Sequence, residues 1–295
     1  MKKILTFFNL ILFSCSLLVI NSCIEDPTGP GNTLNGNSNL PESSLENVAY
    51  GTDTRQVYDI FLPANRDANT PIILMIHGGA WKAGRKEDFN SYQNLIKTKW
   101  SNVAIVNMNY RLASNANNIH HTEIMEDIDA VVNHVLANKT EYHISDKIGV
   151  IGASAGGQLA MIYAYKYNDN IKCVANIFGP SNLRDWSWYN SVNIWLGAYI
   201  GDILTEYVGQ SWDTTAYKAV SPYWNVNSST QPTIIFHGSL DPIVPVYQSQ
   251  WMRGKLNGLG VTNQYHEYLA FHSFDNTQSN DVINKLIAFF KNYLE

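Results

Sequence analysis

The chain has few cysteines, and this limits both its redox chemistry and its means of stabilisation. It contains 3 cysteines in 295 residues: Cys15, Cys23 and Cys173. The first two lie in, or directly after, an apolar run at the N-terminus. The rest of the chain then holds a single thiol, so it can form no internal disulfide. Because Cys173 lies in the apolar stretch 171–178, we expect it to be a small core residue rather than a nucleophile.

Positive charge and metal-ligand clusters are also scarce. The formal net charge is −5, and no basic run stands out, so nucleic acid is not an expected partner. Among 8 histidines, only His120 and His121 are adjacent, and they are followed by Glu123 without a further group of ligands. A structural or catalytic zinc site needs three or four ligands. We therefore predict no metal site, and we expect both histidines to be solvated residues at the start of a helix.

The first residues have the pattern of an export signal. A basic start, Met1–Lys3, precedes the apolar run 4–20, which is too short and wrongly flanked for a secure membrane span. The sequence Ile20-Asn-Ser-Cys23 resembles a bacterial lipoprotein lipobox. The resemblance implies that residues 1–22 are a signal peptide, that Cys23 is the site of lipid attachment, and that the protein is anchored in the membrane of the cell envelope. An ordinary signal peptide that contains a cysteine is the alternative.

A change of composition separates this leader from the remainder. Residues 23–42 are rich in Pro, Gly, Asn and Ser and show no apolar periodicity. Such a composition is typical of a flexible tether. We expect the folded domain to comprise residues 43–295, with no internal repeats.

Apolar runs of strand length alternate with helical patterns through this domain. The expected strands are 57–62, 71–76, 102–109, 148–151, 171–178, 233–237 and 264–269, and the expected helices include 124–136, 158–165 and 281–294. Continuous apolar runs are typical of strands covered on both faces. This alternation predicts an α/β fold, a three-layer sandwich with a mostly parallel central sheet and an antiparallel edge at 57–62.

One long segment interrupts the alternation. Residues 181–226 lie between two expected strands and contain many tryptophans and tyrosines. A connection of this length usually has a function. We predict a small helical cap that covers the carboxyl edge of the sheet, with some of its rings, Trp186 among them, facing a substrate pocket.

The pentapeptide Gly152–Gly156 is the strongest chemical signal. Its serine, Ser154, follows an apolar strand and precedes a helix, which is the context of a nucleophile elbow. A tight turn there requires small neighbours, projects the hydroxyl above the sheet and leaves the amide of Ala155 free to face an oxyanion.

Three further motifs follow expected strands in the order that this chemistry needs. His77-Gly-Gly-Ala-Trp81 offers a glycine-rich loop whose amides can approach a ligand. Asp241 lies in a turn after a strand and can hold an imidazole tautomer. His272 follows the last strand and is the natural general base. His77 precedes the serine, whereas the general base comes last in the order Ser…Asp…His. We therefore expect His77 to orient its loop rather than to act as the base. We expect Trp81 to border the acyl pocket.

Together these motifs resemble the α/β-hydrolase superfamily over nearly the whole domain. The His-Gly-Gly-x-Trp sequence is similar to the esterase/lipase branch that includes hormone-sensitive-lipase-like carboxylesterases, feruloyl and acetyl-xylan esterases and kynurenine formamidases. The resemblance implies a serine esterase that works through an acyl-enzyme, with the triad Ser154, Asp241 and His272 and without a cofactor. It also implies an oxyanion hole built from Gly78, Gly79, Ala80 and Ala155, in which Gly78 shapes the turn.

Substrate identity is less constrained by the sequence. We expect small acyl or aryl esters, such as acetyl or feruloyl groups on polysaccharide. A kynurenine-formamidase-like amidase and a serine peptidase remain alternatives within the hydrolases. A catalytically inactive binding lipoprotein on the same scaffold is the alternative from another class, and the complete triad argues against it. The oligomeric state is not predicted.

Overall fold

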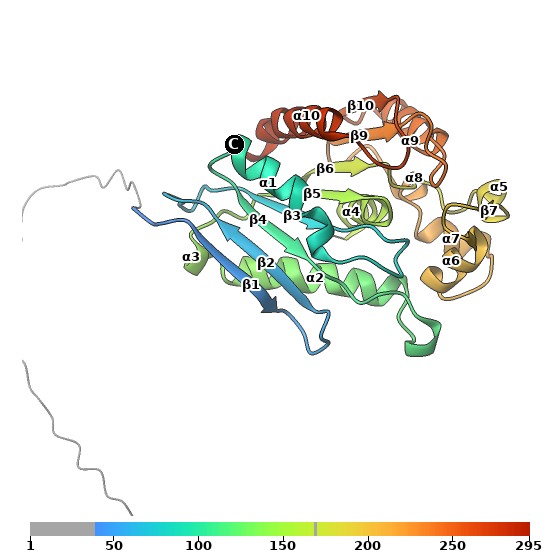
Figure 1. Ribbon diagram of the computed structural model, residues 1–295, viewed down its shortest axis with the longest axis horizontal. Coiled ribbons are helices and arrows are strands. Elements are labelled where there is room, and N and C mark those ends of the chain that lie inside the picture. Colours follow the sequence, from blue (N-terminus) through green and yellow to red (C-terminus); the bar gives the residue numbers. More distant parts are fainter. Residues whose placement is uncertain (1–38, 168–169) are drawn as a thin grey trace, which may run out of the picture. The chain divides into compact units, whose positions relative to one another are not determined.

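The structure, a computed structural model, describes residues 39–167 and 170–295, which form a central sheet with helices on both faces (Figure 1). The strands are β1 (Ser43–Ala49), β2 (Val57–Leu62), β3 (Ile72–Ile76), β4 (Ala104–Met108), β5 (Ile148–Ala153), β6 (Ile171–Ile177), β7 (Val192–Asn193), β8 (Ala198–Tyr199), β9 (Thr233–Gly238) and β10 (Asn263–Tyr268). The helices are η1 (Lys86–Phe89), α1 (Asn90–Lys99), η2 (Asn115–Asn117), α2 (His121–Ala137), α3 (Lys139–Tyr142), α4 (Ala155–Lys166), α5 (Trp186–Tyr189), α6 (Ile200–Val208), α7 (Thr214–Ala219), α8 (Pro222–Asn225), α9 (Tyr247–Gly258) and α10 (Asn276–Leu294).

The main sheet has the order β1-β2-β4-β3-β5-β6-β9-β10. Strand β2 pairs antiparallel with β1 and β4, and the remaining neighbours pair in parallel. The predicted antiparallel edge and mostly parallel sheet are therefore confirmed. Because parallel strands end at the same edge, the loops that follow β3, β5, β9 and β10 meet there.

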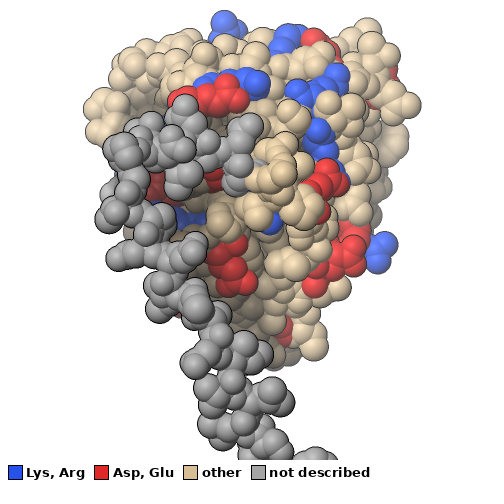
Figure 2. Space-filling view, turned by 90° about the vertical axis from the view of Figure 1, so that its left-hand side faces the viewer, with Lys and Arg blue, Asp and Glu red and all other residues tan. Residues whose placement is uncertain are grey.

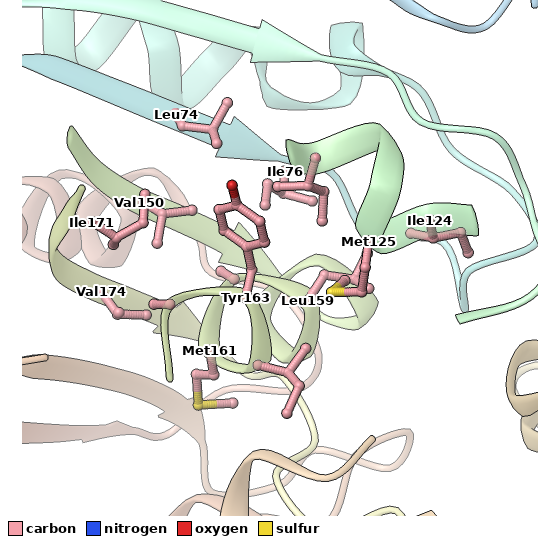
Figure 3. Close-up of a cluster of buried hydrophobic side chains, with 14 of the residues drawn as sticks. Leu74, Ile76, Ile124, Met125, Val150, Leu159, Met161, Tyr163, Ile171 and Val174 are labelled. Carbon is pink, nitrogen blue, oxygen red and sulfur yellow. The ribbon is translucent and has the colours of Figure 1, made fainter. Parts of the chain in front are cut away.

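Two hydrophobic clusters cover the two faces of this sheet. Alternate side chains of β3 belong to different clusters: Leu74 and Ile76 to one, Ile73 and Met75 to the other. The first cluster includes side chains of α2 and α4, and the second includes side chains of α1 and α10. Figure 3 shows the first cluster, where strand residues meet α4 and the start of α2. Each such side chain stabilises the fold by about 1.5–3 kcal/mol when it is fully buried, and the result is the expected three-layer sandwich.

Residues 181–226 form the cap as short helical pieces, α5 to α8, together with a small antiparallel hairpin of β7 and β8. These elements lie beyond the carboxyl ends of β5 and β6 (Figure 1). Helix α6 is the longest of them and buries Ile200, Ile203, Leu204 and Tyr207. The hairpin was not predicted, because its strands are two residues long and carry no periodic signal.

The start of the domain differs from the prediction. Strand β1 was not expected, since most of its side chains are exposed and do not alternate between apolar and polar. The last residues of the predicted tether are also attached to the domain: the carbonyl of Leu40 accepts from the amide of Asn65 at 2.8 Å, and Arg66 donates to the carbonyl of Pro41 at 2.6 Å. The predicted signal peptide, Cys23 and most of the tether lie outside the described residues.

Within residues 39–167 and 170–295, none of the helices has the length and apolarity needed to cross a bilayer. On the face drawn in Figure 2, acidic and basic side chains lie close to one another between larger uncharged areas. The visible surface therefore carries both signs of charge in mixed groups.

Candidate active site

Ser154 occupies a strained turn between β5 and α4. Its backbone has φ 54° and ψ −124°, and positive φ is uncommon for a residue other than glycine. The flanking positions require glycine because other parts of the backbone approach them closely. A Cβ atom on Gly152 would lie 2.0 Å from the carbonyl oxygen of Gly156, and a Cβ on Gly156 would lie 2.0 Å from that of Ile76. The predicted strand–turn–helix elbow is thus formed, with Ser154 at its tip.

The structure brings Ser154, His272 and Asp241 into one hydrogen-bonded chain. Nε2 of His272 lies 2.9 Å from Oγ of Ser154, and Nδ1 lies 2.6 Å from Oδ2 of Asp241. A carboxylate can only accept, so Nδ1 carries the proton and donates it to Asp241. Nε2 is then left as an acceptor for the Ser154 hydroxyl. This is the tautomer that a general base needs.

Asp241 is buried, and both of its carboxylate oxygens have hydrogen-bond partners. Its Oδ1 accepts from the amides of Ile243 and Val244 at 2.8 and 3.0 Å, and its Oδ2 lies 3.2 Å from Nε2 of His237 as well as beside His272. Burial by itself raises the pKa of this carboxyl, but the hydrogen bonds from the two histidines outweigh it and lower the pKa to about 2. Asp241 is therefore a carboxylate at neutral pH.

His237 is a supporting residue that the sequence analysis did not single out. It is fully buried at the end of β9. Its Nε2 donates to the carbonyl of Val244 at 2.9 Å, and its Nδ1 accepts from the Ser249 hydroxyl at 2.6 Å. These contacts tie the loop that carries Asp241 to the end of β9 and the first turn of α9. The only sequence signal was its position four residues before Asp241.

The loop after β3 has an unusual backbone. Gly79, Ala80 and Trp81 all have positive φ, at 114°, 51° and 60°. A Cβ on Gly79 would lie 2.2 Å from the carbonyl oxygen of Ala83, so glycine is required there. Among the described residues, the amides of Gly79, Ala80 and Ala155 have no acceptor within hydrogen-bonding distance. They are free to bind a developing oxyanion, as the resemblance implies for these positions.

Gly78 packs against the elbow instead. A Cβ atom on Gly78 would lie 2.9 Å from the carbonyl oxygen of Ala153 and 3.1 Å from Cβ of Ser154. A side chain there would push the loop away from the serine. The turn-shaping role expected of Gly78 agrees with this close approach.

His77 orients this loop, as predicted. It is fully buried, stacks on Tyr110 with ring centroids 4.3 Å apart, and donates from Nδ1 to the carbonyl of Gly78 at 2.6 Å. Its Nε2 lies 3.3 Å from Nη2 of Arg55. Burial lowers the pKa of His77 to about 4, so the ring is neutral at neutral pH. Tyr110 also donates to the carbonyl of His77 at 3.1 Å.

A narrow apolar pocket opens beside Ser154. Its volume is about 30 Å³. It is lined by Ala80, Trp81, Ser154, Ala155, Pro180, Trp188, Leu196, Ile200, Ile203, Leu204, Ile243 and Val244. Helix α6 thus supplies three of these lining residues, Ile200, Ile203 and Leu204. A wider and more open hollow of about 450 Å³ adjoins this pocket at the same serine and includes Lys82 and His272 in its lining.

Of the two tryptophans expected at a substrate pocket, Trp81 lines this pocket and Trp186 does not. Trp186 is 56% exposed, stacks on Tyr189 and meets Trp212 edge-on. Trp188, from the same short helix, takes the pocket position and donates to the carbonyl of Ile243 at 3.2 Å. Two residues apart on a helix face nearly opposite directions, and the aromatic-rich sequence does not tell which of them faces inward.

The prediction for His121 is wrong. Only 7% of this residue is exposed, and its Nδ1 lies 2.6 Å from the hydroxyl of Tyr207 on α6. The cap folds back over the start of α2, which the sequence does not reveal. Burial, with a smaller contribution from Lys166, lowers the pKa of His121 to about 3. His120 is half-buried, and its Nδ1 donates to the carbonyl of Glu206 at 2.8 Å.

Known proteins resemble this chain in sequence and in fold. The chain is 25% identical to dipeptidyl aminopeptidase BIII of Pseudoxanthomonas mexicana over 85% of its length, and 24% identical to esterase LipC of Mycobacterium tuberculosis over 77%. It spans only 38% and 59% of those two relatives. Among solved structures, a truncated carbohydrate esterase from gut microbiota matches with a TM-score of 0.71 and 20% identity, over 86% of this chain and 98% of that one.

That structural match shows the fold, which is the α/β-hydrolase fold of esterases. A family model described as BD-FAE matches residues 58–256, which run from β2 into α9 and contain Ser154 and Asp241. His272 lies beyond this match, on the loop after β10. The chain belongs to the BD-FAE family of α/β-hydrolases.

Proposed function

We propose that the protein is a serine carboxylic-ester hydrolase that removes short acyl groups through an acyl-enzyme. The observation that carries this proposal is the chain from Asp241 through His272 to Ser154, at 2.6 and 2.9 Å, beside the unpaired amides of Ala80 and Ala155. An inactive binding scaffold has no need of this arrangement. The esterase names of relatives such as LipC support the same reaction class.

The proposed mechanism follows from the protonation states. Oγ of Ser154 attacks the ester carbonyl while its proton passes to Nε2 of His272. The carbonyl oxygen becomes an oxyanion and accepts from the amides of Ala80 and Ala155, with Gly79 beside them. His272 then gives the proton to the departing alcohol. Water enters and its oxygen bonds to the acyl carbon while His272 takes one of its protons. The bond between that carbon and Oγ then breaks as His272 returns the proton to Ser154, and the acyl group leaves as a carboxylic acid. Asp241 holds the imidazolium throughout.

The dimensions of the pocket favour a small acyl group. One water molecule needs roughly 10–15 Å³ of such space, and the pocket beside Ser154 has about 30 Å³. An acetyl methyl group fits this volume, whereas a feruloyl ring or a long chain does not. The open hollow that contains His272 and Lys82 suits the alcohol, because His272 must protonate the leaving oxygen. Of the acyl groups considered from sequence, we therefore favour acetyl.

A panel of esters tests both the reaction and the acyl size. With p-nitrophenyl acetate, butyrate and octanoate beside methyl ferulate and acetylated xylan, we expect kcat/KM to be highest for acetyl esters and at least about 10-fold lower for octanoate, since each excluded methylene forfeits roughly a kcal/mol of binding. The variant Leu204→Ala should enlarge the pocket and shift the preference toward butyrate.

The control for this panel is Leu183→Ala. Leu183 is fully buried in the same hydrophobic cluster but does not line the pocket. Both substitutions should destabilise the protein by about 2–5 kcal/mol, yet only Leu204→Ala should change the order of substrates. Equal turnover of octanoate and acetate by the wild type would refute the small-acyl proposal. Turnover of N-formylkynurenine or of a dipeptide arylamide in preference to every ester would replace it with the amidase or peptidase alternative.

We further propose that the protein is exported and lipid-anchored through Cys23, from which the chain could reach esters on extracellular polysaccharide. The lipobox-like sequence and the polar stretch after it support this proposal. Multiple acyl chains on one cysteine would give a stable anchor. We expect Cys23→Ser to move the protein from the membrane fraction to the soluble fraction, measured by fractionation and immunoblot. Unchanged fractionation, with no incorporation of labelled palmitate into the wild type, would exclude the anchor.

A further inference from the structure

Gln158 is a buried polar residue that the proposed mechanism leaves unused. It lies on α4, one turn after Ser154, and none of its surface is exposed. Its Oε1 accepts two hydrogen bonds, from Nε1 of Trp81 at 2.9 Å and from the hydroxyl of Tyr207 at 3.0 Å. Its Nε2 donates to the carbonyl of Val220 at 2.8 Å. One side chain thus joins the helix of the nucleophile, the loop after β3 and two parts of the cap.

The directions of these bonds fix the orientation of the side-chain amide of Gln158. An indole nitrogen can only donate, so the oxygen of Gln158 must face Trp81, and the nitrogen must face Val220. The hydroxyl of Tyr207 donates its only proton to Gln158, and it therefore accepts from Nδ1 of His121 at 2.6 Å. The indole of Trp81, the hydroxyl of Tyr207 and both ends of the Gln158 amide are thus paired, whereas Nε2 of His121 is buried without a partner among the described residues. Buried hydrogen bonds that join several side chains in this way hold them in one arrangement.

This network fixes a backbone that would otherwise relax. Ala80 and Trp81 both have positive φ, at 51° and 60°, and such strain persists only where the surroundings determine it. Trp81 is held at its nitrogen by Gln158 and at its face by Tyr207, whose ring is stacked 4.3 Å away at 15°. Holding the indole in place holds the backbone turn that leaves the amide of Ala80 unpaired.

The cap is tied to the same loop at the surface. Lys82, directly after Trp81, forms an ion pair with Glu206, directly before Tyr207. Glu206 also accepts from the amide of Asn115 at 3.3 Å. Helix α6 therefore contacts the loop at two neighbouring points, one buried and one partly exposed.

We propose that Gln158 is a positioning residue that holds the oxyanion loop, through Trp81, in the conformation that stabilises the transition state. The inference rests on the proposed function, because it assigns the free amide of Ala80 to an oxyanion. It also makes helix α6 part of the oxyanion-binding apparatus through Tyr207 as well as a wall of the acyl pocket. Gln158 itself touches neither substrate nor Ser154 Oγ and acts only through its neighbours.

The test is Gln158→Met, which keeps the length of the side chain and removes all three hydrogen bonds. Because loss of one oxyanion donor typically lowers kcat by about 10²–10³-fold, and the loop here is loosened rather than cut, we expect kcat for p-nitrophenyl acetate to fall about 10- to 100-fold. KM should change less than 3-fold, because the bonds act on the transition state. Labelling of Ser154 by a fluorophosphonate should slow by a similar factor.

Two further variants separate positioning from stability. Gln158→Glu keeps an acceptor for Trp81 and Tyr207. Burial favours its protonated form, which can still donate to the carbonyl of Val220, so this variant should recover most of the lost kcat. Gln248→Met is the matched control, because Gln248 is another fully buried glutamine, which accepts from the amides of Ser181 and Asn182 at 3.1 and 2.8 Å. It should lower the melting temperature as much as Gln158→Met does while leaving kcat within 2-fold.

These experiments distinguish failure of the positioning role of Gln158 from failure of the esterase proposal. If the wild type shows no turnover that depends on Ser154, the esterase proposal fails. If the wild type is active and Gln158→Met retains its kcat, or Gln248→Met loses as much, the positioning role is overturned. Should Gln158→Met not fold, Tyr207→Phe removes a single hydroxyl from the network, and we expect a 3- to 10-fold lower kcat. An unchanged kcat in that variant overturns the proposal as well.

Discussion

Replacing Ser154 with alanine is expected to lower kcat for acetyl esters by at least about 10⁴-fold, since removal of the nucleophile leaves only the oxyanion hole and substrate binding. Among the described side chains, the hydroxyl of Ser154 is hydrogen-bonded to His272 alone. Its loss should therefore leave the fold intact, and alanine keeps a Cβ at the same strained φ of 54°. Steady-state kinetics on p-nitrophenyl acetate, with thermal unfolding measured in parallel, would check both expectations.

Ser145→Ala provides the control for this substitution. Ser145 is also buried, but it precedes β5 at the opposite end from Ser154, where its hydroxyl accepts from the amide of Lys147 at 3.1 Å. Its loss should leave kcat unchanged. Equal turnover by Ser154→Ala and the wild type would end the assignment of a serine mechanism and bring the inactive-scaffold alternative forward.

The second large effect is expected for Asp241→Asn, about a 10⁴-fold loss of kcat at neutral pH. The reason lies in the two oxygens of Asp241. The amides of Ile243 and Val244 donate to Oδ1, so the asparagine oxygen must take that position and its NH₂ group must face His272. The NH₂ group then donates to Nδ1, which forces the proton onto Nε2. In that tautomer His272 cannot accept the proton of Ser154.

Asp127→Asn is the matched control, because Asp127 is another buried carboxylate, paired with Arg111 at 2.7 Å. It should lower stability and leave the triad intact, so kcat per folded molecule should not change.

The pH–rate profile provides a second readout. Because the pKa of Asp241 is held at about 2, its ionisation should not contribute to the profile near neutrality. A wild-type rate for Asp241→Asn at pH 7 would show that the carboxylate does not set the tautomer.

Most of the sheet could be predicted because its strands are buried on both faces. A strand such as β3 is a continuous apolar run, and such runs stand out from polar loops in any single sequence. The elements that were missed lack this signal. Strand β1 is mostly exposed, and helices α1 and α9 bury only a few side chains each. Their places depend on the neighbours against which they pack, and a local pattern does not record these.

The sequence by itself determined the order of the reactive groups and the turns that carry them. The elbow at Ser154, the glycine-rich loop after β3 and the positions of Asp241 and His272 all follow from short contiguous motifs. Their chemistry is local, because a strained turn or a free amide needs particular residues within four or five positions. Once the strands are parallel, these motifs must meet at one edge of the sheet.

Only the tertiary structure decided what surrounds those groups. It placed Trp188 rather than Trp186 in the pocket, buried His121 under α6, and set His237 beside Asp241. It also joined Gln158 to Trp81 across 77 positions of sequence. For Trp188, His121 and Gln158 the physical reason is the same: their contacts join distant segments and depend on how the cap folds over the sheet, and that packing leaves no periodic trace in the chain. His237 meets Asp241 because the turn after β9 folds back on the end of its strand.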